Sequence, residues 1–186
     1  MISLASLWLP VLLSAVLVFV ASSVIHMTPL WHKSDYPQMP REAEVMDALR
    51  PFAIPPGDYF IPRAGSMKAM RSPEFKEKMS RGPVAMLTVL PNGPPAMNRN
   101  LIQWFLFLIV VAGFVALVTC RTLPIGTPYL RVFKVAGTVA FVGYFLAQCQ
   151  QSIWYRRPWG VTLKYAFDGV IYAMLTAGTF GWLWPR

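Results

Sequence analysis

The chain has 186 residues, of which 55% are hydrophobic and only 13% are charged, and its formal net charge is +9 at pH 7. Soluble domains contain about 25% charged residues, so this composition excludes an ordinary soluble protein and favours burial in lipid. The basic residues are scattered beside apolar segments, so the charge does not indicate nucleic-acid binding and fits contact with anionic lipid headgroups.

Four long apolar runs predict four transmembrane helices. A helix needs about 20 apolar residues to cross a hydrocarbon core of roughly 30 Å. The runs predict helices over residues 4–25, 101–120, 129–152 and 163–184. We therefore expect an all-α integral membrane protein, with transmembrane helix 1 in residues 1–25, an extramembrane loop domain in residues 26–100, and transmembrane helices 2–4 in residues 101–186. The length of the first run favours a retained helix over a cleaved signal peptide.

The long loop is expected to form a small α+β domain. Residues 40–52 predict a helix, and Ser72 predicts the cap of a second helix that stops at Gly82. Residues 58–61 and 84–90 predict two short strands bounded by Pro and Gly. A domain of about seventy residues has a marginal core, so we expect it to rest on the helices or on a partner.

Basic residues near the predicted helix ends indicate the orientation. The side of the long loop carries Lys33, Arg41, Arg99, Arg156, Arg157 and Lys164, and the side of the termini carries Arg121, Arg131, Lys134 and Arg186. Cytoplasmic segments carry an excess of Lys and Arg. This modest difference predicts a protein of the bacterial inner membrane, with the loop of residues 26–100 cytoplasmic and both termini outside.

Two rows of small residues predict close helix packing. The fourth run has Gly169, Ala173, Ala177 and Gly181 at intervals of four, and the third run has Ala136, Ala140, Gly143 and Ala147. Small residues let helix backbones approach closely in lipid. The rows predict that these two helices pack together; a homodimer face is the alternative.

Asp168 is the one acidic residue inside an apolar run. Charged groups are costly in lipid, so an acid there suggests a function. Lys164 lies one helical turn earlier, and Arg156 and Arg157 are close in sequence. We expect an ion pair at the membrane interface between Asp168 and one of these residues; a proton or cation relay is the alternative.

His26, His32 and Asp35 are candidate ligands of a divalent metal ion. Their spacing matches no helical ligand face and no known metal motif, so the favoured interpretation is an interfacial turn in which histidine bonds to the backbone. A polar cluster, Gln148, Gln150 and Gln151, closes the third predicted helix and is expected to form hydrogen bonds between helices.

The sequence has no Gly-rich phosphate loop, HExxH, GxSxG or CxxC motif. No catalytic residue and no cofactor is therefore predicted. We expect a non-enzymatic accessory, assembly or scaffold protein that binds other membrane proteins or itself. The alternatives are a small oligomeric transporter or proton-coupled channel component that uses Asp168, and a membrane metal-handling protein or enzyme that uses the two histidines.

Overall fold

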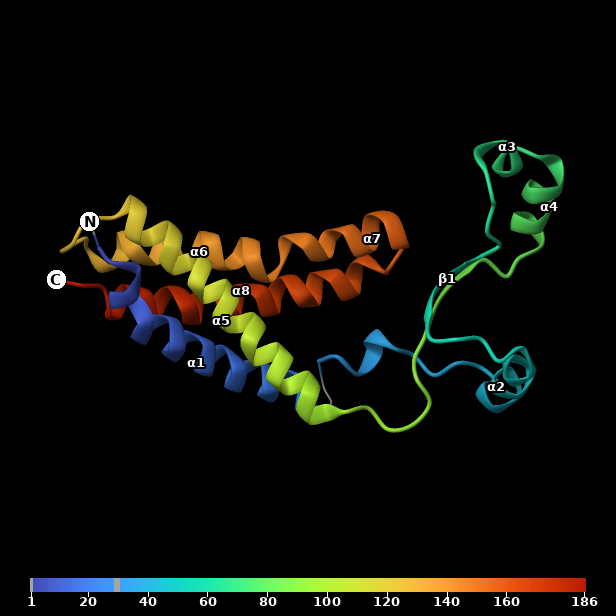
Figure 1. Ribbon diagram of the computed structural model, residues 1–186, viewed down its shortest axis with the longest axis horizontal. Coiled ribbons are helices and arrows are strands. Elements are labelled where there is room, and N and C mark those ends of the chain that lie inside the picture. Colours follow the sequence, from blue (N-terminus) through green and yellow to red (C-terminus); the bar gives the residue numbers. More distant parts are fainter. Residues whose placement is uncertain (1, 29–30) are drawn as a thin grey trace. The chain divides into compact units, whose positions relative to one another are not determined.

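The computed structural model describes residues 2–28 and 31–186 (Figure 1). The chain divides into two units, one formed by residues 1–37 and 96–186 and the other by residues 38–95. The first unit is a helix bundle, and the second is a small unit of short helices and two strands. Residues 31–37, which the sequence analysis assigned to the loop domain, group with the bundle.

The helices of the bundle follow the predicted apolar runs. The short 3-10 helix η1 (Leu4–Leu7) continues into α1 (Trp8–Met27), and α5 spans Met97–Thr122. The third run forms α6 (Tyr129–Tyr144), the 3-10 helix η4 (Leu146–Gln148) and α7 (Cys149–Tyr155), and the fourth forms α8 (Trp159–Trp182). Within the described ranges, residues 4–27, 97–122 and 129–155 are long and apolar enough to cross a membrane. These three segments support the prediction of a transmembrane protein.

The four long helices contact one another in a ring. α6 contacts α8, α8 contacts α1, α1 contacts α5, and α5 contacts α6. The start of α1 and the end of α8 lie at one end of the bundle, and α7 lies at the other (Figure 1). Fully buried side chains such as Leu7, Val18, Leu108 and Phe180 fill the space between the helices.

α6 ends at Tyr144, whereas the sequence predicted a helix to residue 152. Phe145 leaves the helical conformation (φ −123°, ψ −46°), and its buried side chain lies against Gly169 of α8. After this break, η4 and α7 carry the polar cluster. Gln148, Gln150 and Gln151 are exposed there, so they do not lie inside the bundle.

The small residues of α8 bring it close to α6. A Cβ atom on Gly169 would lie 2.9 Å from Cβ of Phe145, and one on Gly181 would lie 2.7 Å from the ring of Tyr129. Ala177 contacts Gly137, a residue of α6 that the predicted row omits.

Members of the α6 row differ in their surroundings. Ala136 and Ala140 are fully buried, whereas Gly143 lies against Val111 of α5. Ala147 lies beyond the break, in η4, and is exposed.

The second unit has the predicted α+β composition. Its helices are α2 (Glu42–Leu49), the 3-10 helix η3 (Arg50–Phe52), the single turn α3 (Met67–Met70) and α4 (Pro73–Arg81). Strands β1 (Gly57–Ile61) and β2 (Ala85–Val89) pair antiparallel. As predicted, Ser72 caps α4, because its Oγ accepts a hydrogen bond from the backbone N–H of Phe75 at 3.1 Å, and Gly82 ends it.

This second unit has no core of its own. None of residues 38–95, all of which the structure describes, is buried. Large apolar side chains are instead exposed, including Phe52 at 72%, Leu90 at 71% and Met67 at 65%. A two-stranded sheet is at best marginally stable in water, and the unit adds no buried side chain to this pair of strands.

Candidate functional site

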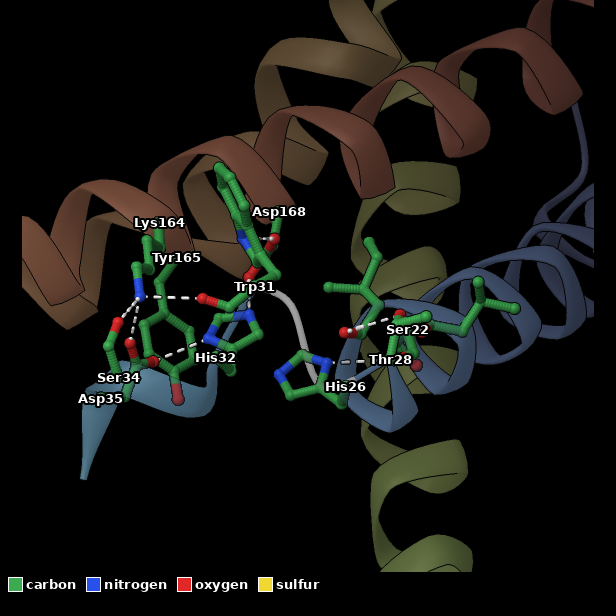
Figure 2. A network of polar contacts seen from close by, with 12 residues as sticks. Ser22, His26, Thr28, Trp31, His32, Ser34, Asp35, Lys164, Tyr165 and Asp168 are labelled. Atoms are coloured by element: carbon green, nitrogen blue, oxygen red, sulfur yellow. Dashed lines mark hydrogen bonds and ion pairs between the residues drawn. The ribbon is translucent and has the colours of Figure 1, made fainter. Parts of the chain in front are cut away.

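A network of polar side chains joins three parts of the bundle (Figure 2). They are the end of α1, the segment of residues 31–36 that contains the 3-10 helix η2 (Lys33–Asp35), and the first half of α8. The network holds both acidic residues of this unit, Asp35 and Asp168, together with both histidines of the chain. Within the described residues, no other part of the bundle holds an acidic or histidine side chain.

Asp168 is buried, with 2% of its side chain exposed. The indole Nε1 of Trp31 donates a hydrogen bond to its Oδ1 at 3.1 Å, and Nε2 of His32 lies 2.9 Å from its Oδ2. Both partners lie more than 130 residues away in sequence. The expected ion pair with Lys164, Arg156 or Arg157 does not occur, since His32 is the one ionic partner of Asp168 among the described residues.

Lys164 binds the segment of residues 31–36 instead. Its Nζ donates to the carbonyl oxygen of Trp31 at 2.8 Å, to Oγ of Ser34 at 2.7 Å and to Oδ1 of Asp35 at 2.7 Å. These bonds fasten the segment to α8. Lys164 and Asp168 therefore do not pair with each other, and each pairs with a residue of this segment. Helical geometry explains this, because residues 164 and 168 lie one turn apart on one face of α8 and the segment packs across that face.

Asp35 has only 1% of its side chain exposed, and each of its oxygens has a partner. Oδ1 accepts from Lys164, and Oδ2 accepts from Nδ1 of His32 at 2.7 Å. Burial alone would raise the pKa of this carboxyl, but the hydrogen bonds and positive charges of Lys164 and His32 outweigh it and lower the pKa below its ordinary value.

His26 lies at the end of α1 with its side chain exposed. Its Nδ1 lies 3.0 Å from the carbonyl oxygen of Ser22, one turn earlier in the same helix. A carbonyl oxygen only accepts, so Nδ1 carries the proton and Nε2 has a free lone pair. The ring is stacked on that of His32, with centroids 4.4 Å apart and planes 12° apart.

One ligand atom from each of His26, His32 and Asp168 lies within 4.8 Å of the other two. In a tetrahedral site with bonds of about 2.0–2.1 Å, ligand atoms lie about 3.3 Å apart. The 2.9 Å between His32 and Asp168 is already close to that separation. Movements of about 1–2 Å would bring all three atoms onto one ion, and His26 can make them because it lies at an exposed helix end.

Two of these three residues, His26 and His32, are among the candidate metal ligands predicted from the sequence. The third candidate, Asp35, instead accepts a hydrogen bond from Nδ1 of His32, whose Nε2 faces Asp168. Asp168 was predicted as a member of an ion pair, and its hydrogen bond from Trp31 was not predicted. A signal for the pairing was present, because an acid inside an apolar helix needs a partner and the chain has only two histidines.

The basic residues of the α7–α8 turn lie beside this network. Arg157 lies over the ring of Tyr165, 4.8 Å from its centroid, and Tyr165 in turn lies 5.2 Å from the ring of His32. Arg156 is exposed and adopts a left-handed conformation (φ 55°) at the end of α7. Arg157 thus packs against Tyr165, which in turn packs against His32.

The His32 ring lies between the two carboxyl groups of the network. Its Nδ1 lies 2.7 Å from Oδ2 of Asp35, and its Nε2 lies 2.9 Å from Oδ2 of Asp168. Lys164 pairs with Asp35, whereas Asp168 has no lysine or arginine partner among the described residues.

Comparisons with models of protein families, with curated proteins and with solved structures found no match to this chain.

Proposed function

We propose that this protein binds a divalent transition-metal ion at one end of its helix bundle, through His26, His32 and Asp168. The observation that carries the proposal is the convergence of these three ligand atoms, from three separate segments, within 4.8 Å. Two imidazoles and one carboxylate form a ligand set typical of zinc and of other late first-row metals. Zn²⁺ is the ion that we expect.

The groups that form hydrogen bonds to the two histidines support this proposal. Histidines that bind metal usually donate their second N–H to a carboxylate or a backbone carbonyl, which fixes the orientation of the ring. Both arrangements are present, since His32 donates to Asp35 and His26 donates to the carbonyl of Ser22. Lys164 holds Asp35 in turn.

The charge of the site supports it as well. Asp168 is buried, and no lysine or arginine among the described residues pairs with it. A buried carboxylate without a compensating charge costs several kcal/mol, and a divalent ion bound beside Asp168 would supply positive charge.

Calorimetric titration of Zn²⁺ into the purified, chelator-treated full-length protein tests this proposal. We expect one ion per chain. The affinity should fall on the order of tenfold or more in His26→Ala and in Asp168→Asn, because loss of a group that only hydrogen-bonds to a metal ligand already costs about tenfold or more in affinity. His26→Ala is the sharper variant, since the His26 side chain is exposed and has no ion-pair partner among the described residues. Asp47→Asn, an exposed acid of α2, is the matched control. Equal affinities in all four proteins would refute the site.

The proposal includes four spans. α8 has 24 residues and occupies one place in the ring of helices, so we count it as the fourth span of a bacterial inner-membrane protein whose loop of residues 26–100 is cytoplasmic. A reporter that is active only in the periplasm should be silent when it is fused after Gly93 and active when it is fused after Arg186. The opposite pair of results would reverse the orientation.

A second role, as an accessory, assembly or scaffold protein, is supported by the second unit. It has no buried side chain of its own within residues 38–95, and Phe52 and Leu90 are among its most exposed residues. A partner protein would cover such side chains. Mild detergent purification should recover that partner with the wild type and with Glu77→Ala, but not with Phe52→Ser combined with Leu90→Ser. Recovery of the same proteins by all three would contradict this role.

A further inference from the structure

We infer that a groove between α6 and α8 is a binding site for an anionic phospholipid, with an acyl chain in the groove and the phosphate at Lys134. The groove has a volume of about 380 Å³. Its floor contains Gly137, Ala173 and Ala177, where a Cβ atom on Gly137 would lie 3.2 Å from that of Ala177. This site is independent of the proposed metal ion.

The groove owes its shape to the contrast between small and large side chains. Phe133 and Phe141 lie one turn before and one turn after Gly137 on α6, so they flank the gap that the glycine leaves. Met174 lines the groove from α8. The surface is apolar over about 10 Å, the rise of the seven residues from Lys134 to Phe141, and suits a flexible hydrocarbon chain.

Charge favours an anionic lipid over a zwitterionic one. Lys134 lines the groove, is exposed, and has no ion-pair partner among the residues that the structure describes. Arg131 lies one turn nearer the start of α6. The acids of the bundle, Asp35 and Asp168, are buried in the network on the first half of α8, away from this end. An exposed ammonium group attracts a lipid with a net negative charge more strongly than a zwitterionic lipid.

The same charges argue against a second copy of the chain as the occupant. In a symmetric dimer the same surface patch lies on both sides of the interface. Lys134 and Arg131 of one chain would then approach those of the other, whereas the acidic side chains of the bundle, Asp35 and Asp168, are held in the polar network. A lipid phosphate supplies that negative charge.

Native mass spectrometry of the purified full-length protein tests this inference, with phosphatidylglycerol and phosphatidylcholine of identical acyl chains as the probes. We expect phosphatidylglycerol to be retained preferentially and Lys134→Gln to reduce that preference about fivefold, since one surface cation contributes about that factor. Arg99→Gln, at the other end of the bundle, is the charge control. Thr138→Phe should fill the groove and displace both lipids, whereas Val142→Phe, on α6 outside the groove, should not.

Three results would overturn the inference. They are equal retention of the two lipids by the wild type, an unchanged preference in Lys134→Gln, and a dimer that Thr138→Phe dissociates. The last would show that a second copy occupies the groove. None of these measurements uses metal, so their outcome does not depend on the proposed metal centre.

Discussion

Replacement of Gly169 by alanine tests the close approach of α8 to α6. The added methyl group would lie 2.9 Å from Cβ of Phe145, whereas carbon atoms in favourable contact lie about 3.5–4.0 Å apart. Phe145 cannot rotate out of the way, because its Cβ is attached directly to the backbone at the end of α6. One helix must therefore move by about 0.6–1 Å.

The magnitude follows from two opposing contributions. Overpacking of this kind costs about 1–3 kcal/mol, while alanine in place of glycine inside a helix contributes about 0.5–1 kcal/mol in the opposite direction. We expect Gly169→Ala to lower the free energy of unfolding by about 1–2 kcal/mol. Gly178→Ala on the same helix is the control, because the nearest atom, the hydroxyl oxygen of Tyr129, would lie at an ordinary 3.7 Å.

Denaturant unfolding of the purified protein in detergent, followed by tryptophan fluorescence, measures the difference. Gly178→Ala should be as stable as the wild type or slightly more stable, and Gly169→Ala should be less stable than both. If the two variants have equal free energies of unfolding, α8 does not pack against the end of α6 as described.

Three further predictions concern the bundle and its polar network. Ala177→Leu should lower the free energy of unfolding by about 1–3 kcal/mol, because this fully buried residue contacts α6; unchanged stability would place the residue towards lipid. Lys164→Met removes the lysine partner of the buried Asp35 carboxylate at a cost of about 3 kcal/mol, so amide hydrogen exchange in residues 31–36 should accelerate about a hundredfold, whereas the exposed Lys33→Met should leave it unchanged. Tyr172→Phe should raise stability by about 1 kcal/mol in the same unfolding assay, because its hydroxyl is the one buried side-chain polar atom without a partner in the described ranges; a loss of stability would indicate a partner.

The long helices could be predicted from the sequence because hydrophobicity alone determines them. Each apolar run became helical, with ends shifted by a few residues. The break after Tyr144 could not be predicted, since no proline marks it and the polar cluster begins only at Gln148. It depends on the contact between Phe145 and Gly169, and that contact exists only once α6 and α8 are packed together.

The site was harder to predict than the helices. Sequence neighbours suggested that Asp168 pairs with Lys164, but ionic partners in a folded chain are chosen by proximity in space. The segment of residues 31–36 crosses the face of α8 and brings His32 to Asp168 and Asp35 to Lys164. The two histidines and Asp168 were each recognised as unusual, and the one signal that could have joined them is that an acid inside an apolar helix needs a partner.

The most direct test of the metal centre is anomalous diffraction at the zinc absorption edge, from crystals of the full-length protein loaded with one equivalent of Zn²⁺. We predict one peak per chain, about 2.0–2.2 Å from a nitrogen of His26, a nitrogen of His32 and a carboxylate oxygen of Asp168, with Asp35 still bonded to the other nitrogen of His32. A map without that peak, in which His32 remains hydrogen-bonded directly to Asp168, would contradict the proposal. The network would then serve only to hold the segment of residues 31–36 against α8 through hydrogen bonds and ion pairs.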